Sequence, residues 1–527
     1  MLARMPPPTR PTTDACPGAL RLHSAEDGRV ARIRVPGGVL TGRQAAVLAD
    51  AADRLGDGHL GITSRGNVEI RGLDQHDAAE WTDLLTGAGL LPSHRHERVR
   101  NIVATPLSGL DGRGHADTRA WAAQLDALLC GQDWTAELSG RFLFVLDDGR
   151  GDVTGLGGDV TVSGAPGGRA VLRVGAHTAR IAAADAPRAA LAAARAFLDA
   201  ARAAGTGAWR VDELPSGHAP DLAGALHRAG LEAEFTAAAA HPTEPTAPTE
   251  PTEPTDLATP TAPAESAAPA ESAGSGGSGG TGGTGGTAGG PPPGLLPAPD
   301  GTVVLSVFPR LGRLSVAQWR ALLPGSGGEL RLTPWRGIVV PGCAAAVADE
   351  RLRALERAGF VTRADSPWYG LGACTGAPGC AKSRSDVRSD ASAAARAGAR
   401  VPDALPAGGH GLPVYWSGCA RRCGHPHGDW VDVLAADDAP AQETLEAQEA
   451  QDGAPGDNRG TPPHGAPGTA GPTPAARHGY RTALRRTAVP APAPAPVTGP
   501  DPDPDSLVPL VSPVPPVRVP PTRASAQ

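Results

Sequence analysis

Four cysteines carry the clearest chemical signal in this sequence. Cys374 and Cys380 are separated by five residues and Cys419 and Cys423 by three, with 38 residues between the two pairs. Four thiolates arranged as two close pairs are typical of one metal centre. Small residues flank both pairs and leave room for backbone N–H groups to approach the sulfurs: Gly376, Pro378, Gly379, Gly418 and Gly424. Such hydrogen bonds help to set the potential of an iron–sulfur cluster.

Zinc and unrelated buried thiols are the alternative interpretations of these cysteines. Structural zinc sites usually separate their paired cysteines by roughly two to four residues, and here only the Cys419/Cys423 pair has such a spacing. Four independent thiols, each packed as a small hydrophobic side chain, are the third interpretation. The spacing and the flanking glycines favour an iron–sulfur cluster over both.

Composition and charge limit the class of protein. The chain has 527 residues, among them 70 Gly and 55 Pro, and its formal net charge is −7. Its basic residues are dispersed arginines rather than runs, so nothing indicates nucleic-acid binding. We expect a cytoplasmic protein without a membrane span, because no signal-like apolar core and no run of about eighteen apolar residues occurs. Seven cysteines, four of them clustered, fit a reducing compartment.

An internal repeat organises the elements that must position the cysteines. An alternating strand at 30–35, a helix capped by Thr41, and strands at 60–63 and 68–70 form a β-α-β-β unit. A second copy of the unit lies near 301–342, where Ser315-Val-Ala-Gln318 corresponds to Thr41-Gly-Arg-Gln44. Neither copy alone presents a large core. We therefore expect the copies to pair about a pseudo-twofold axis and to share one sheet system.

The remaining foldable segments alternate strands with helices, which indicates an α/β arrangement. The expected helices span 117–130, 187–204, 344–359 and 380–398, and the expected strands lie at 141–146, near 160, and at 171–174, 412–416 and 431–434.

Three segments cannot bury enough apolar surface to fold. Residues 1–17 are Pro-rich, 241–293 consist of Pro-Thr-Glu repeats followed by Ser/Gly and Thr/Gly repeats, and 439–527 are mostly Pro, Gly, Ala and Thr. We expect a disordered leader, linker and tail. A stretch at 478–486 is the one part of the tail that could be structured.

Several motifs together resemble the nitrite and sulfite reductase family. The Cys-x5-Cys and Cys-x3-Cys spacing resembles the family's [4Fe–4S] signature, and both β-α-β-β copies resemble its ferredoxin-like half-domains. The supporting motifs are Thr63-Ser-Arg-Gly-Asn67, Arg71-Gly72, Arg100-Asn101 and Thr333-Pro-Trp-Arg336. The resemblance covers about 20–235 and 300–435.

The resemblance implies a mixed α+β fold with the two half-domains in pseudo-twofold arrangement. The predicted domains are a disordered leader (1–17), half-domain one (18–92), an α/β domain (93–240), the linker (241–293), half-domain two (294–362), a [4Fe–4S]-binding domain (363–438) and the tail (439–527).

Within the family, the chain resembles the precorrin-3B synthase subgroup. The Cys16-Pro-Gly motif and the small number of structured residues expected after Cys423 support this resemblance. It implies that precorrin-3A is hydroxylated with γ-lactone formation in aerobic cobalamin biosynthesis. O₂ and an external electron donor, an NADH-linked reductase or ferredoxin, would be the other partners. No membrane or nucleic-acid partner is expected.

The resemblance also implies residue roles. Cys374, Cys380, Cys419 and Cys423 would ligate the cluster, and His425 and His427 could ligate a non-haem iron. The residues predicted to bind the tetrapyrrole substrate are Arg65, Asn67, Arg71, Lys382 and Arg384, and those predicted to be catalytic are Arg100, Asn101 and Arg141. Arginine suits such roles because its guanidinium pairs bidentately with carboxylates.

Two other functions stay open at this point. A sirohaem-dependent ferredoxin–nitrite or sulfite reductase would hold the tetrapyrrole as a resident cofactor instead of a substrate. A non-catalytic electron carrier would hold the cluster alone.

Overall fold

The computed structural model describes residues 14, 16–235, 290–323, 328–401, 411–436 and 479–486. Together these residues belong to one compact unit. Most of the predicted leader, linker and tail lies outside them. Among the described helices, none is long and apolar enough to cross a membrane.

The first half-domain has the predicted β-α-β-β order, extended by one strand at its start, a short third strand and a closing helix. Its elements are β1 (His23–Ala25), β2 (Gly28–Ile33), β3 (Val39–Thr41), α1 (Gly42–Arg54), β4 (His59–Ile62), β5 (Val68–Leu73) and α2 (Ala78–Gly87). The side chain of Thr41 accepts from the N–H of Gln44, and the Gln44 side chain accepts from the N–H of Thr41. This capping box confirms the predicted start of the helix.

The second half-domain repeats the first element by element. It comprises β12 (Gly294–Pro297), β13 (Thr302–Val307), β14 (Arg313–Ser315), α6 (Val316–Leu322), β15 (Glu329–Leu332), β16 (Ile338–Ala344) and α7 (Ala345–Arg357). Ser315 and Gln318 form the equivalent capping box. The predicted repeat is therefore present in the structure, with a shorter capped helix in the second copy.

The two half-domains exchange their short third strands. Strand β14 pairs antiparallel with β4, and β3 pairs antiparallel with β15. The sheet orders are β1-β2-β5-β4-β14 and β12-β13-β16-β15-β3. The expectation of one shared sheet system is corrected to two five-stranded sheets, each completed by a strand from the other copy.

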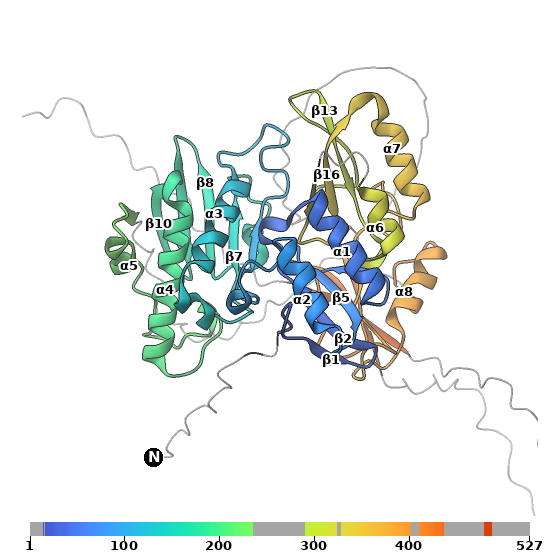
Figure 1. Cartoon of the computed structure of the whole chain (residues 1–527), viewed down its shortest axis with the longest axis horizontal. Helices are drawn as coiled ribbons and strands as arrows, with labels where there is room; N and C mark the ends of the chain where they lie inside the picture. Colours follow the sequence, from blue (N-terminus) through green and yellow to red (C-terminus); the bar gives the residue numbers. More distant parts are fainter. Residues whose placement is uncertain are drawn as a thin grey trace, which may run out of the picture. The chain divides into compact units, whose positions relative to one another are not determined.

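A single core joins the two half-domains. Helices α1 and α6 pack together (Figure 1), and Trp319 on α6 is fully buried. Its indole N–H donates to the carbonyl of Ala45 on α1 at 2.8 Å. Because neither copy buries its apolar face alone, this contact makes the stability of one copy depend on the other.

The middle domain contains one six-stranded sheet covered by helices α3 and α4 (Figure 1). Its elements are β6 (Ile102–Ala104), α3 (Thr118–Cys130), β7 (Phe144–Asp147), β8 (Val160–Ala165), β9 (Arg169–Val174), β10 (His177–Ala182), α4 (Ala186–Ala204), α5 (Leu222–Arg228) and β11 (Glu234–Phe235). The strand order is β11-β10-β9-β8-β7-β6. The Ala-rich helix α4 contributes most of its buried face to this core.

The cysteine domain contains a four-stranded sheet and one helix. Its elements are β17 (Leu371–Ala373), α8 (Val387–Arg396), β18 (Val414–Ser417), β19 (Trp430–Ala435) and β20 (Tyr480–Arg485). The helix expected to begin at Cys380 begins at Val387, because the side chain of Asp386 caps it by accepting from the N–H of Ser389. Strand β20 lies inside the segment predicted to be a disordered tail.

The cysteine domain repeats the strand directions of the middle domain. In the middle domain β6, β7 and β8 run parallel and β9 returns antiparallel. In the cysteine domain β17, β18 and β19 run parallel and β20 returns antiparallel. The internal repeat therefore extends beyond the two half-domains, and β20 is the counterpart of β9.

The indole of Trp319 gives a test of the core that joins the two half-domains. We expect Trp319→Ala to lower stability by about 3–5 kcal/mol, through lost burial and a residual cavity. Trp319→Phe should cost less, since it retains an aromatic ring but loses the bond to Ala45. Thermal unfolding of each full-length variant measures this. Trp134→Ala, at a partly buried ring of the middle domain, is the control, and an equal loss there would contradict the assignment.

Candidate functional site

The cysteines lie at one edge of the parallel part of the cysteine-domain sheet. Cys374 directly follows β17, and Cys419 is two residues beyond the end of the neighbouring strand β18. The carboxyl ends of parallel strands meet at one edge of a sheet, which is where α/β proteins place their ligands. The N–H of Cys374 donates to the carbonyl of Trp416 at 3.0 Å and ties the two loops together.

The surroundings of Cys374 fit an iron–sulfur cluster. The N–H of Gly418 donates to the Sγ of Cys374 at 3.3 Å. A side chain at Gly418 would collide with Ser383, so the close approach of this backbone requires glycine. Burial raises the pKa of the Cys374 and Cys423 thiols, and the neighbouring cysteines raise it further. A metal group that binds thiolates would offset this unfavourable clustering of sulfur ligands.

The cysteines do not have the geometry of a site for one ion. Four thiolates around a zinc ion at about 2.3 Å would lie within roughly 4 Å of one another. Among the described residues, no three His, Cys, Asp or Glu side chains gather closely enough to hold a single ion. The possible non-haem iron at His425 and His427 stays a prediction.

Four arginines hold positive charge at buried or half-buried positions without an ion pair among the described residues, and two of them, Arg336 and Arg388, lie beside the cysteine loops. Within the described residues, none of Arg34, Arg65, Arg336 and Arg388 contacts a carboxylate. Arg65 donates to the carbonyls of Gly140 and Arg141, and Arg388 to that of Leu311. Arg34 is 1% exposed, and its Nη2 has no partner in the described part of the chain. We call these four residues the unpaired arginines.

Burial and repulsion from neighbouring arginines lower the pKa of three of these arginines. Burial, followed by the charges of Arg32 and Arg65, lowers the pKa of Arg34 to about 9. Burial and neighbouring arginines also lower the pKa of Arg65 and of Arg388 to about 10. All stay protonated at neutral pH. The site is therefore a region of positive charge that an anionic ligand would stabilise.

His427 marks the point where the two half-domains meet the loop after Cys423. Burial and the nearby charges of Arg65, His425, Arg210 and Arg336 lower the pKa of His427 to about 4. Arg65 comes from the β4–β5 turn and Arg336 from the equivalent β15–β16 turn. Both copies of the repeat thus deliver an arginine to the same loop.

Arg336 adopts an unusual backbone conformation to reach this loop. Its φ is +61°, and the residue at the equivalent place in the first turn is Gly66, with φ +66°. A non-glycine residue costs energy in this region, and such outliers cluster at functional sites. The guanidinium donates to the carbonyl of Gly424 and lies 5.2 Å from the ring of Tyr415. Tyr415 in turn donates to the carbonyl of Cys423 at 2.6 Å.

Two buried asparagines support Arg65. The amide of Asn101 donates to the carbonyl of Gly140 at 2.5 Å, and Arg65 donates to that same carbonyl. Asn67 accepts from the N–H of Val35 and lies 3.4 Å from Asn101. Asn67 and Asn101 thus support the turn that carries Arg65, and the substrate-binding and catalytic roles predicted for them stay predictions.

Arg71 holds the cysteine loop instead of an open anion site. Its guanidinium pairs bidentately with Asp27, contacts Glu69 at 3.3 Å and donates to the carbonyl of Gly379 at 3.0 Å. Two carboxylates neutralise its charge. Arg71 therefore links the first half-domain to the loop that ends at Cys380, and its predicted substrate-binding role stays a prediction.

The predicted catalytic arginines also have other contacts. Arg100 is buried in a bidentate pair with Asp126, at 2.6 and 2.7 Å, and donates to the carbonyl of Leu90. Arg141 is 43% exposed and lies 3.5 Å from Glu213. The structure therefore gives Arg100 a packing role. Arg141 contributes its backbone carbonyl to Arg65.

The two substrate-binding residues predicted after the cysteine loop lie at the surface. Lys382 is exposed. Arg384 is also exposed, and its Nη1 donates to the carbonyl of Ala435 at 3.4 Å. Neither belongs to the unpaired arginines, so their predicted role stays a prediction.

Sequence reasoning missed Arg34, Arg210 and Tyr415. The alternating pattern of residues 30–35 places Arg34 on the polar face of a half-buried strand, but that face is covered. Arg34 donates to the carbonyl of Arg98, at the start of the middle domain. The one signal in the sequence was that Arg34 follows Arg32 by two residues in the alternating stretch 30–35. That spacing does not show that the Arg34 side chain is buried.

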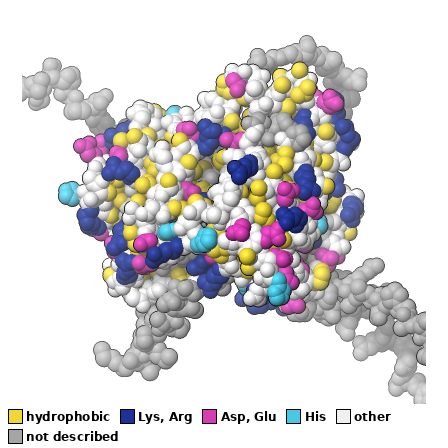
Figure 2. Space-filling model, viewed as in Figure 1, with side chains coloured by type: hydrophobic (Ala, Val, Ile, Leu, Met, Phe, Trp, Pro, Cys, Tyr) yellow, Lys and Arg dark blue, Asp and Glu magenta, His cyan; other side chains and the backbone are white. Residues whose placement is uncertain are grey.

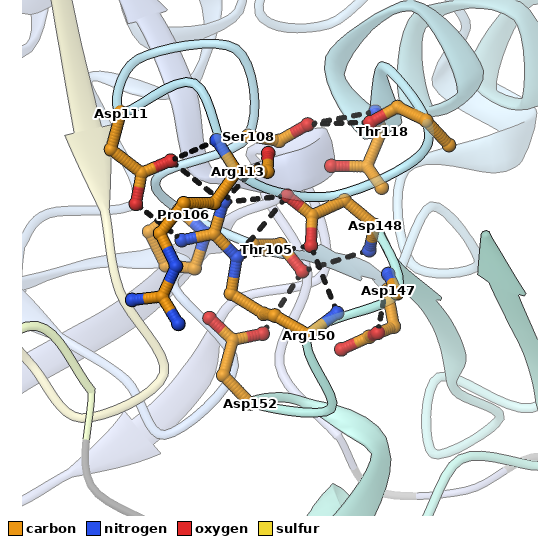
Figure 3. Close-up of polar contacts among 12 residues, drawn as sticks. Thr105, Pro106, Ser108, Asp111, Arg113, Thr118, Asp147, Asp148, Arg150 and Asp152 are labelled. Carbon is orange, nitrogen blue, oxygen red and sulfur yellow. Dashed lines mark hydrogen bonds and ion pairs between the residues drawn. The ribbon is translucent and has the colours of Figure 1, made fainter. Parts of the chain in front are cut away.

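The middle domain has a network of one arginine and several carboxylates where the cysteine domain has its thiols. Figure 3 shows Arg150 between Asp111 and Asp148, beyond the carboxyl ends of β6 and β7. Thr105 donates to Asp152 at 2.9 Å, and burial raises the pKa of Asp152 to about 7. Charges in this copy are paired, in contrast to those around the cysteines.

Comparison with known proteins finds a match in the first half-domain. Residues 23–88 match the nitrite/sulfite reductase ferredoxin-like half domain. This part of the chain is therefore similar to a half-domain of the nitrite and sulfite reductases. The region matched is the first half-domain, which carries Arg65, Asn67 and Arg71.

Two curated proteins match part of this chain's sequence. The ferredoxin–nitrite reductase of Synechococcus elongatus is 35% identical over 127 residues, 23% of this chain and 25% of that protein. The precorrin-3B synthase of Sinorhizobium sp. is 33% identical over 135 residues, 26% of this chain and 28% of that protein. The matches thus span only about a quarter of either relative.

A solved structure shows the same fold. The Mycobacterium tuberculosis NirA protein aligns with a TM-score of 0.56, covering 78% of this chain and 72% of that one at 17% identity. This likeness supports the mixed α+β architecture across most of this chain's length.

The low pKa of His427 gives a pH test of the site. The folded state keeps His427 neutral down to about pH 4, whereas the ordinary pKa is 6.5. Because the unfolded state binds the proton first, this contribution to stability is full above about pH 6.5 and is lost as the pH falls toward 4.

We expect the wild type to lose up to about 2 kcal/mol more than His427→Gln between pH 7 and pH 5. Urea unfolding of the full-length, metal-free proteins measures the difference. His177→Gln, at an exposed histidine on β10, should behave as the wild type. The same pH dependence in His427→Gln would show that His427 does not titrate this way.

Proposed function

We propose that this chain is an oxidoreductase that holds a [4Fe–4S] cluster on Cys374, Cys380, Cys419 and Cys423 and an anionic tetrapyrrole beside it. The observation that supports this most is the meeting of Arg65 and Arg336, from equivalent turns, at the loop after Cys423. Members of the nitrite and sulfite reductase family typically bind a [4Fe–4S] cluster and sirohaem, a tetrapyrrole with several carboxylates.

The protein residues have distinct roles in this proposal. The unpaired arginines bind and orient carboxylates, since charge-assisted hydrogen bonds replace the missing ion pairs. The N–H of Gly418 hydrogen-bonds a cysteine sulfur, and Arg71 holds the loop before Cys380. When bound, the cluster would supply single electrons. His427 stays neutral beside the arginines and can accept a hydrogen bond or a proton from the ligand.

The finer proposal is precorrin-3B synthase activity. One oxygen atom of O₂ would enter precorrin-3A, the other would leave as water, and an NADH-linked reductase or ferredoxin would supply two electrons. The partial match to a precorrin-3B synthase supports this assignment. A ferredoxin-dependent nitrite reductase is the second candidate, favoured by the match to the Synechococcus elongatus enzyme.

Cofactor content separates the two candidates. We expect anaerobically purified protein to contain about four iron and four acid-labile sulfide per chain, with broad cluster absorbance and no haem bands. Incubation with precorrin-3A, O₂ and a reductant should then add one oxygen atom, measured by mass spectrometry. Haem bands with nitrite reduction would instead establish the reductase. A cluster with neither activity would leave only an electron carrier.

Binding of a tetrapyrrole tests the unpaired arginines directly. Arg65→Met and Arg336→Met should each weaken binding of a tetrapyrrole polycarboxylate such as uroporphyrin by roughly ten- to a hundredfold, the value of a charge-assisted hydrogen bond. Fluorescence quenching of the ligand measures the affinity. Arg180→Met, which removes an exposed arginine from β10, is the matched control. Equal affinity in all variants would remove these arginines from the site.

A further inference from the structure

Strand β20 lies far along the chain from the cysteines but contacts both of their loops. It pairs with β19 along its whole length, from Ala435 opposite Tyr480 to Trp430 opposite Arg485. The unit that contains the described residues ends at Arg486, one residue after this strand. As the counterpart of β9, β20 completes the cysteine-domain sheet.

One end of β20 contacts the residues that hold the first cysteine loop. The hydroxyl of Tyr480 lies 2.6 Å from Ser385 Oγ and donates to Asp390 on α8. Its ring packs edge-on against Trp416, with centroids 4.7 Å apart. The carbonyl of Ser385 accepts from the N–H of Ala377 at 3.0 Å, and Ala377 lies between Cys374 and Cys380.

The other end of β20 contacts the second cysteine loop through a shared carboxylate. Arg485 Nε donates to Asp432 Oδ2 at 3.0 Å, and Arg422 Nε donates to the same oxygen at 2.5 Å. The Asp432 side chain is 2% exposed. Arg422 lies between Cys419 and Cys423, has a φ of +49°, and donates its own N–H to the carbonyl of Cys419.

We infer that β20 is a clamp on the cluster-binding loops, with Tyr480 and Arg485 as positioning residues. Tyr480 acts through Ser385 on the Cys374–Cys380 loop, and Arg485 acts through Asp432 and Arg422 on the Cys419–Cys423 loop. The inference rests on the proposed function only in that the loops bind a cluster. A buried carboxylate shared by two guanidinium groups suits this role, because removing one leaves the strained Arg422 turn with less support.

Amide hydrogen exchange in the full-length, cluster-free protein tests each arm by itself. Tyr480→Phe keeps the ring against Trp416 and removes the hydroxyl, so the Ala377 amide should exchange roughly three- to tenfold faster with Arg422 unchanged. Arg485→Ala should instead accelerate exchange of the Arg422 amide and leave the Ala377 amide unchanged. Arg485→Lys should restore most of the protection of the Arg422 amide. Arg481→Ala, which removes an exposed arginine from the same strand, should change neither amide.

Iron release from the reconstituted protein tests the consequence for the cluster. Tyr480→Phe and Arg485→Ala should each lose iron to a chelator roughly three- to tenfold faster than the wild type. The double variant should show the product of the two factors, since the two side chains act on separate loops.

Unchanged exchange in both variants, or equal acceleration of both amides in each, would overturn the clamp. A wild type that binds no cluster on reconstitution would overturn the proposed function. The exchange rates of the Ala377 and Arg422 amides in Tyr480→Phe and Arg485→Ala would still test the clamp, because they are measured in the cluster-free protein.

Discussion

The burial of guanidinium charge without carboxylate partners is the constraint on which the rest of this structure depends. An isolated charge removed from water is costly, and a fold retains one only where rigid surroundings hold it. Here backbone carbonyls provide that support, from Gly140 and Arg141 for Arg65 and from Leu311 for Arg388. These carbonyls come from the middle domain and the second half-domain. Each of these two arginines is therefore held by a carbonyl from a domain other than its own.

The internal repeat shows how the same architecture can carry opposite electrostatics. Polar groups gather at both parallel-strand edges, beyond the carboxyl ends of the strands, which is where α/β sheets place their ligand sites. In the middle domain Arg150 pairs with both Asp111 and Asp148, so these three side chains carry a net negative charge (Figure 3). In the cysteine domain thiols occupy the edge, and Arg388 faces them with no counter-ion among the described residues. Basic and acidic side chains are interspersed across the face drawn in Figure 2. The charge imbalance is therefore local to the site.

Local signals allowed the sequence to predict the elements, but not the contacts that decide residue roles. The capping boxes at Thr41 and Ser315, the repeat and the cysteine spacing are short-range patterns, and the corresponding elements are present. The partners of Arg71 and Arg100, Asp27 and Asp126, lie 44 and 26 residues away, so the sequence could not show these ion pairs. Strand β20 lies in the stretch 478–486, which the sequence marked as the part of the tail that could be structured. The sequence did not show that this stretch pairs with β19.

Unpaired charge couples the stability of the site to its occupancy. Any ligand that binds the folded state and not the unfolded state stabilises the fold by mass action. Burial first, and then repulsion between neighbouring positive groups, lowers the pKa of Arg34, Arg65 and His427. An anion bound beside them would relieve the repulsion and so stabilise the folded state. It would also raise the pKa of His427, which would link anion binding to proton uptake at this loop.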